Sequence, residues 1–193
     1  MAATIRMVVG LGNPGPRYRR TRHNVGFMVA EALLDRARSG QDRMKDSALV
    51  APISLGGLEI QVVQPQTFMN ASGPAVAAVA RRSGIDAGEI LLVYDDADLE
   101  VGALRIRQSG SPAGHRGVAS VVECLGTRDV PRIRLGIGKD TGELAERVLA
   151  PFDRAEMPAV ERMIVDACDA VELTVARGLI AAMNQYNRRA QPD

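Results

Sequence analysis

Short apolar runs and amphipathic stretches alternate along the chain, separated by glycine, proline or acidic residues. Nearly continuous apolar runs are typical of buried strands, which we predict at residues 5–11 and 89–94. The segment RIRLGIG at 132–138 is predicted to be a further strand. Residues 103–108 alternate between apolar and polar side chains, which predicts a half-buried strand. Residues 48–55 and 58–64 flank the pair Gly56 and Gly57, a turn signal that predicts a β-hairpin.

Between these strands, apolar residues recur at helical spacing. The predicted helices are one whose apolar face carries Val25, Met28, Val29, Ala32 and Leu33, one from Ser72 to about Arg82, one near 115–125, and one from about Glu156 onward. Ser72 is a candidate N-cap, and Gly40 and Gly84 are the expected stops of the first two helices. The alternation of strands and helices, with one hairpin, predicts an α/β fold: a single domain over residues 1–193 with a twisted mixed β-sheet flanked by helices.

The composition is that of a globular protein. Apolar residues make up 46% of the 193 residues and aromatic residues 3%, so the core must consist of aliphatic side chains. This excludes a disordered chain, a collagen-like repeat and a disulfide scaffold. The longest N-terminal apolar run, residues 7–11, is too short for a signal peptide or a membrane helix. We interpret Cys124 and Cys168, set among apolar residues, as buried free thiols, and expect a cytoplasmic protein that does not contact a membrane.

The charges nearly cancel, at a formal +1, but they are distributed unevenly. Arginine is in excess over acidic residues in residues 1–38 and 101–134, whereas acidic residues are in excess in 143–172. The densest basic cluster is Arg17, Arg19, Arg20 and Arg22. Such polarity favours one face that binds a polyanion, although a merely solvated face would give the same pattern.

One motif points to a dinucleotide. Gly10, Gly12 and Gly15 follow a predicted strand with the spacing Gly-x-Gly-x-x-Gly. In a dinucleotide site the third glycine opens a helix, but here prolines bracket Gly15 and four arginines precede the helical pattern. Asp35, the acid about 20 residues further on, falls within the predicted helix. This context disfavours a dinucleotide-dependent enzyme.

The sequence also contains no clear metal-binding motif and no clear motif for a catalytic nucleophile. Asp95, Asp96 and Asp98 follow a strand and could hold Mg²⁺, or form a solvated loop with one functional acid. Two histidines and two cysteines are too scattered for a structural zinc site. There is no Gly-x-Ser-x-Gly nucleophile motif.

The candidate chemistry lies at strand ends. Asn13 and Asp95 follow predicted strands, where α/β sheets build their sites, and His23 lies beside the arginine cluster. A histidine is often only structural. A histidine base oriented by an aspartate, with asparagines to hold an amide or carbonyl, would instead suit hydrolysis by an activated water.

Five segments, in order, resemble the bacterial-type peptidyl-tRNA hydrolase family: GLGNPGPRY at 10–18, TRHNVGF at 21–27, PQTFMNASG at 65–73, ILLVYDDADL at 90–99 and GHRG at 114–117. The resemblance covers nearly the whole chain. It implies a monomeric α/β enzyme that cleaves the ester joining a peptide to the 3′-terminal ribose of tRNA, and so recycles peptidyl-tRNA released from ribosomes. No metal or other cofactor is expected.

The resemblance also implies roles by position. His23 is expected to be the general base and Asp95 its orienting partner. Asn13 and Asn70 are expected to bind substrate, and Tyr18 and Phe68 to line the site that receives the tRNA end. Among the basic residues, we expect phosphate contacts first from Arg105, Arg107 and Arg134, and next from residues 17–22.

The sequence departs from the family in one motif. The family has Gly-His-Asn-Gly where this chain has Arg116 in place of asparagine, and the preceding loop, residues 109–113, is less rich in glycine. Arg116 is expected to grip the tRNA end, or else to point into solvent while His115 takes over the lost contact. The departure leaves open an RNA-binding protein without activity, but the retained His23 and Asp95 favour a hydrolase.

Overall fold

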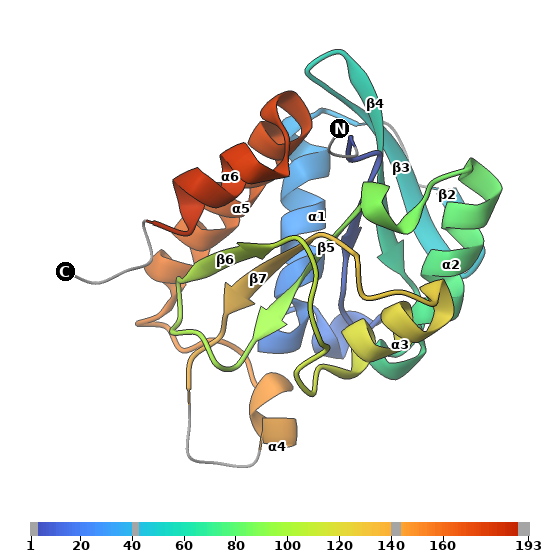
Figure 1. Ribbon diagram of the computed structural model, residues 1–193. Coiled ribbons are helices and arrows are strands. Elements are labelled where there is room, and N and C mark those ends of the chain that lie inside the picture. The colour runs from blue at the N-terminus through green and yellow to red at the C-terminus, as the bar shows by residue number, and fades with distance from the viewer. Residues whose placement is uncertain (1–3, 40–42, 140–143, 189–193) are drawn as a thin grey trace.

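The computed structural model describes residues 4–39, 43–139 and 144–188, in which seven strands form one sheet (Figure 1). The strands are β1 (Met7–Gly10), β2 (Arg43–Lys45), β3 (Ala48–Leu55), β4 (Leu58–Pro65), β5 (Ile90–Asp96), β6 (Leu104–Arg107) and β7 (Arg132–Gly136). Their order is β2-β3-β4-β1-β5-β7-β6. The central strands β4, β1, β5 and β7 run parallel, while β2, β3 and β6 pair antiparallel at the two edges. The predicted mixed sheet is confirmed.

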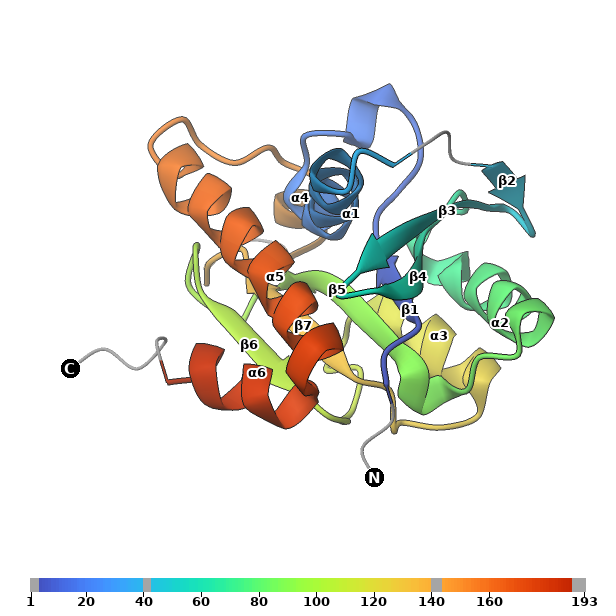
Figure 2. The same cartoon turned by 90° about the horizontal axis from the view of Figure 1, so that it is seen from above.

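Helices cover both faces of the sheet. They are α1 (Val25–Arg36), α2 (Ser72–Ser83), α3 (Arg116–Leu125), α4 (Leu144–Val148), α5 (Met157–Arg177) and α6 (Leu179–Tyr186). Figure 2 shows α1, α5 and α6 on one face and α2 and α3 on the other. Four short 3-10 helices complete the described elements: η1 (Pro16–Tyr18), η2 (Arg22–Asn24), η3 (Met69–Ala71) and η4 (Ala87–Glu89).

Strand β1 is apolar throughout, and β5 is apolar from Ile90 to Tyr94, because each contributes to two cores. In β1, Val8 packs into the core beneath α1 and α5, whereas Met7 and Val9 pack into the core beneath α2 and α3. Leu91 and Leu92 of β5 divide between the same two cores. Side chains alternate across a strand, so burial on both faces removes the polar half of the usual pattern.

Several predicted boundaries hold and others shift. Gly84 ends α2 in a left-handed conformation, with φ of 59°, as predicted. The prediction that Ser72 caps α2 is wrong, because Ser72 is the first helical residue and its hydroxyl donates to the Met69 carbonyl at 2.9 Å. Helix α1 ends at Arg36, and its predicted stop, Gly40, lies outside the described residues.

The glycine motif has a packing role. A Cβ atom at Gly10 would lie 2.3 Å from the Gly26 carbonyl oxygen, and one at Gly12 would lie 2.6 Å from the Phe27 ring. Glycine at these positions lets α1 approach the end of β1. Gly15 precedes the three-residue helix η1 and does not open a long helix. The structure thus explains the motif by close packing of strand and helix.

The two cysteines differ. Cys168 on α5 is buried, and burial raises the pKa of its thiol to about 11. Cys124 on α3 is exposed, so the prediction that both thiols are buried is wrong. Val118, Val121 and Leu125 form the stripe of α3 that packs against the core, and Cys124 lies off it.

No helix within the described residues is long and apolar enough to cross a membrane.

Candidate active site

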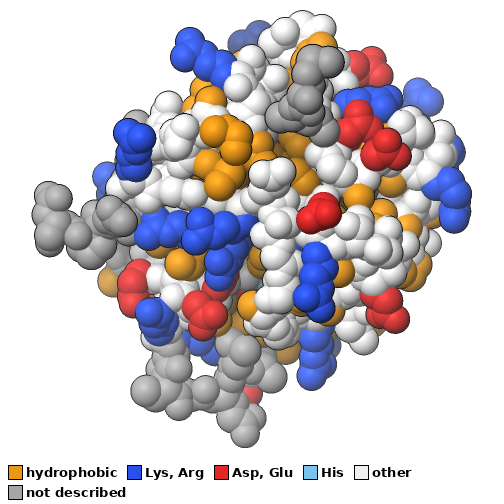
Figure 3. Space-filling view, viewed as in Figure 1, with side chains coloured by type: hydrophobic (Ala, Val, Ile, Leu, Met, Phe, Trp, Pro, Cys, Tyr) orange, Lys and Arg blue, Asp and Glu red, His pale blue; other side chains and the backbone are white. Residues whose placement is uncertain are grey.

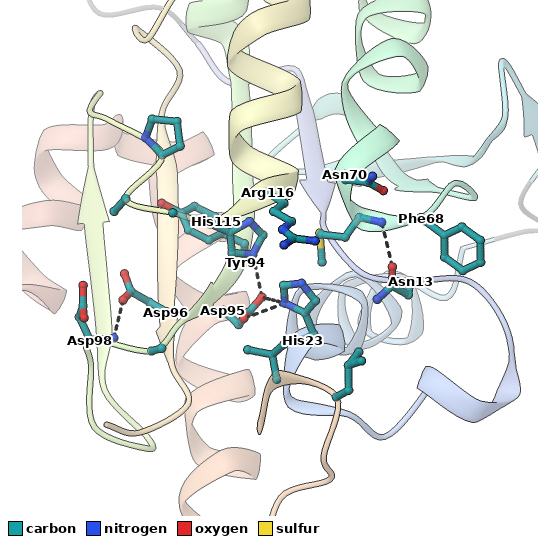
Figure 4. Close-up of a pocket in the computed structure, with 17 residues that line it drawn as sticks. Asn13, His23, Phe68, Asn70, Tyr94, Asp95, Asp96, Asp98, His115 and Arg116 are labelled. Atoms are coloured by element: carbon teal, nitrogen blue, oxygen red, sulfur yellow. Dashed lines mark hydrogen bonds and ion pairs between the residues drawn. The ribbon is translucent and has the colours of Figure 1, made fainter. Parts of the chain in front are cut away.

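A pocket of about 530 Å³ lies at the carboxyl ends of the central parallel strands (Figure 4). Asn13 follows β1 and Asp95 lies near the end of β5, as expected for an open α/β sheet. His23 of η2, Asn70 of η3 and Arg116 of α3 also line the pocket. Helix starts and strand ends therefore bring five predicted site residues, far apart in the sequence, to one cavity.

Asp95 holds His23. The Asp95 side chain is only 3% exposed, and its Oδ1 and Oδ2 lie 2.8 and 2.9 Å from His23 Nδ1. An ionised carboxylate only accepts hydrogen bonds, so the proton of the neutral ring is on Nδ1. The lone pair of Nε2, on the opposite edge of the ring, is left free. This is the tautomer that a histidine needs in order to take a proton from a water molecule.

A second histidine contacts the same carboxylate. His115 Nε2 lies 2.9 Å from Asp95 Oδ1, and the centroids of the His23 and His115 rings are 5.0 Å apart. Burial by itself would raise the pKa of the Asp95 carboxyl. The electrostatic attraction and hydrogen bonds of His115 and His23 outweigh burial and lower that pKa to about 2. No local sequence pattern indicates this contact, because it depends on where the start of α3 meets the end of β5.

His23 is held in place by the residue before it. The Arg22 side chain is buried and donates to the Ile137 carbonyl at 3.1 Å and to both Glu156 carboxylate oxygens at 3.0 and 2.7 Å. The Arg22 backbone N–H donates to the Ala150 carbonyl at 2.9 Å. The prediction that placed Arg22 with the surface arginines is therefore wrong, because its charge is used inside the protein to fix η2.

Asn13 is oriented by its neighbours. Its side-chain oxygen accepts a hydrogen bond from the Met69 backbone N–H at 2.8 Å. Its own backbone N–H and carbonyl both bond to the Asn24 side chain at 2.9 Å. The Asn13 amide nitrogen therefore remains as a donor for a molecule in the pocket. Asn70 lines the same pocket with an exposed side chain.

An aromatic pair lies at the edge of the pocket. Phe68 lines it and is 60% exposed, and the Tyr18 ring meets Phe68 edge to face, with ring centroids 6.3 Å apart. The Arg17 guanidinium lies 4.5 Å from the centroid of the Tyr18 ring. An exposed aromatic ring beside a cation offers a surface on which a base can stack.

The acidic run divides between different partners. Asp95 faces the histidines. Asp96 instead forms an ion pair with Arg134 and accepts a hydrogen bond from the Asp98 backbone N–H. Among the described residues, one trio could hold a metal ion: the ligand atoms of His23, Asp95 and His115 lie within 4.8 Å of one another. The two histidines, far apart in the sequence, thus come together in the fold, where hydrogen bonds to Asp95 join the same atoms.

Comparison with known proteins decides the family. The family model described as peptidyl-tRNA hydrolase matches residues 7–193. The peptidyl-tRNA hydrolase of Syntrophomonas wolfei is 43% identical over 95% of this chain and all of its own length. That of Chloroflexus aggregans is 44% identical over 94% of this chain and 98% of its own length. The crystal structure of peptidyl-tRNA hydrolase from Acinetobacter baumannii superimposes with a TM-score of 0.92 at 30% identity, covering 97% of this chain and 96% of that one.

The chain belongs to the peptidyl-tRNA hydrolase family. It is an enzyme with that family's α/β fold, and the resemblance seen in the sequence is confirmed.

Arg116 lies in the segment 114–117, where the resemblance seen in the sequence leads us to expect an asparagine. It is the first residue of α3, is exposed, and points into the pocket in Figure 4. The structure therefore places it with His23 and Asn13 around one cavity and does not support the alternative in which it points away from the site.

The other predicted phosphate contacts lie outside the lining of this pocket. Arg105 and Arg107 are on β6 and Arg134 is on β7, and Lys and Arg side chains gather over β6 in Figure 3. Arg105 is opposite Arg134 in the register of the sheet. Arg105 donates to the Asn187 carbonyl at 3.1 Å and Arg134 pairs with Asp96, while Arg107 is exposed.

Proposed function

We propose that this hydrolase cleaves the ester between the peptide and the 3′-terminal ribose of peptidyl-tRNA, with His23 as general base and without a metal ion. The observation that carries the proposal is the bond from His23 Nδ1 to the buried Asp95 carboxylate, which directs the basic Nε2 away from Asp95. The family membership supports the choice of substrate.

The reaction needs one proton to move twice. A water molecule loses a proton to His23 Nε2 as its oxygen bonds to the acyl carbon of the ester. The resulting imidazolium faces the Asp95 carboxylate, which stabilises it. The tetrahedral intermediate then breaks the bond to the ribose oxygen, which takes the proton back from Nε2. A base placed in this way contributes about 10²–10⁴ in rate.

The asparagines account for a preference for blocked substrates. The Asn13 amide nitrogen can donate to a peptide carbonyl, and Asn70 can both donate and accept. A free aminoacyl-tRNA carries an ammonium group, which offers no acceptor and leaves one donor unpaired, at a cost of about 1–3 kcal/mol. We therefore propose that N-acetyl-aminoacyl-tRNA is cleaved faster than aminoacyl-tRNA by a factor of about 5 to 150.

The deciding experiment measures the rates at which the purified protein cleaves N-acetyl-aminoacyl-tRNA and aminoacyl-tRNA. Asn70→Ala is the matched variant, because the exposed Asn70 side chain can be removed without breaking the bond that Asn13 makes to Met69. We expect Asn70→Ala to reduce the preference for the blocked substrate. Equal rates on the two substrates with the unaltered protein would refute the role of the asparagines, and binding of tRNA without cleavage would favour an RNA-binding protein.

A second experiment tests the base. His23→Ala should lose about 10²–10⁴ in kcat with an unchanged circular dichroism spectrum, and Asp95→Asn should lose less. Chelation by EDTA should leave the rate unchanged. Full activity of His23→Ala would overturn the mechanism, and a loss on chelation that metal ions restore would overturn the metal-free proposal.

A further inference from the structure

Asp95 is shared between two imidazole rings, and the proposed function uses only one of them. Oδ1 of this buried carboxylate lies 2.8 Å from His23 Nδ1 and 2.9 Å from His115 Nε2. The two rings come from different elements, η2 and the N-terminus of α3. The second ring therefore needs an explanation of its own.

The protonation of His115 follows from its contacts. His115 is the N-cap of the ten-residue helix α3, and its Nδ1 accepts a hydrogen bond from the Val118 backbone N–H at 3.2 Å. A backbone N–H is only a donor, so Nδ1 carries no proton. The proton of the neutral ring is then on Nε2, the nitrogen that faces Asp95. In this arrangement α3 selects the tautomer of His115 that donates to the carboxylate.

The His115 ring is also held by packing. Tyr94 meets it edge to face, with ring centroids 4.9 Å apart. A Cβ atom at Gly117 would lie 3.1 Å from His115 Cε1 and 2.4 Å from Met69 Sδ, so the glycine leaves room for the ring and for Met69. Both ring nitrogens have partners inside the protein, which leaves neither free for substrate.

From this geometry we propose that His115 is a positioning residue: a neutral imidazole, fixed as its Nε2–H tautomer by the start of α3, that orients the Asp95 carboxylate toward His23. The inference rests on the proposed function, and it replaces the expectation that His115 contacts substrate. Asp95 is thus held between donors from both sides, and its rotation away from His23 would break its hydrogen bonds to both rings. The pocket lining at this end of β5 also contains the charged residues Asp96, Asp98 and Arg116. Of these, Asp96 forms an ion pair with Arg134.

The first test reads the tautomers directly. In protein labelled with ¹⁵N in its two histidines, ring-nitrogen NMR at pH 7.5 should show His115 protonated on Nε2 and His23 protonated on Nδ1. His115 protonated on Nδ1 would overturn the proposal. This readout needs no substrate, so it stands even if the protein fails to cleave peptidyl-tRNA, which would count against the proposed function alone.

The second test uses His115→Asn. Asparagine is among the best N-caps, so α3 keeps its cap, but the shorter side chain cannot reach Asp95. We expect kcat to fall by about tenfold with little change in KM, and the His23 ring signals to show a mixture of tautomers. A raised KM with unchanged kcat would instead assign His115 to substrate binding. Unchanged kcat together with an unchanged His23 tautomer would leave His115 as a helix cap only and overturn the proposal.

Discussion

At the scale of single residues, the site is organised around a buried charge. A carboxylate that is nearly inaccessible to water destabilises the fold unless hydrogen-bond donors replace its hydration. Asp95 has such donors from His23 and His115, which together lower its pKa to about 2. The same contacts that prepare His23 for catalysis therefore also stabilise the folded protein.

The dependence of stability on pH follows from that shift. Asp95 has a folded-state pKa of about 2 against a reference of 3.8, so its charge stabilises the fold above about pH 4, and this contribution is lost as the pH falls toward 2. We expect the difference in unfolding free energy between the unaltered protein and Asp95→Asn to shrink by about 2 kcal/mol between pH 5 and pH 2. Urea unfolding at several pH values measures it, with the exposed Asp129→Asn as the control. A constant difference would contradict the shift.

Arg116 is an exposed residue at the start of α3. Its guanidinium points into the pocket and offers a planar set of donors suited to phosphate. We expect Arg116→Asn to remain active and to bind tRNA more weakly. Filter binding of tRNA to the two proteins measures the difference. Unchanged affinity would show that Arg116 does not contact tRNA.

The sequence predicts single residues only where a motif or a strand end marks them. Asn13, His23 and Asp95 are marked in this way, and the structure brings them to one pocket. The contact of His115 with Asp95 and the exposure of Cys124 depend on how α3 packs, which no local pattern records.

At the scale of elements, burial on both faces explains which predictions succeed. Strands β1 and β5 are apolar over most of their length, so they are visible in the sequence. Strand β7 alternates arginine with apolar residues, a pattern that also marks a strand. Strand β2 is not visible, because its three residues are exposed and carry no alternation. The break at Gly178 between α5 and α6 is hidden as well. Buried residues Val171, Val175, Leu179 and Ala182 continue at helical spacing across it.

The ion pair between the buried Arg22 and the partly exposed Glu156 joins elements that the sequence does not connect. It links η2 to the end of β7 and to Glu156 at the start of α5. Arg22→Met should destabilise the fold by about 2 kcal/mol, because the hydrogen bonds to the Glu156 carboxylate and the Ile137 carbonyl are lost, and should lower kcat by loosening His23. The exposed Arg20→Met is the matched control, expected within about 0.5 kcal/mol in the same urea unfolding experiment. Equal stability of the two variants would show that the pair does not fix η2.

At the scale of the whole molecule, the structure shows where part of the arginine excess of residues 101–134 lies on the surface. Arg105, Arg107 and Arg134 lie on the antiparallel pair β6 and β7, beside the parallel strand β5 that ends at the pocket. Like charges directly opposite on a sheet repel, and here the Asp96 carboxylate and the Asn187 carbonyl offset the repulsion. The arginine excess could be predicted from the sequence, but this placement requires the register of the strands.

Contacts between these arginines and tRNA phosphates can be tested by the salt dependence of binding. Each arginine that contacts a tRNA phosphate releases counterions, so its removal lowers the slope of log affinity against log salt by about 0.9 on duplex RNA. Arg105→Ala with Arg107→Ala should weaken the binding of all tRNAs alike and reduce the slope by about 2. The control is Arg154→Ala with Arg162→Ala, two exposed arginines of the acidic segment, which should leave affinity and slope nearly unchanged. Filter binding at several salt concentrations measures both. If the two double variants behave alike, the tRNA footprint lies elsewhere, and the arginines over β6 serve only as a solvated face.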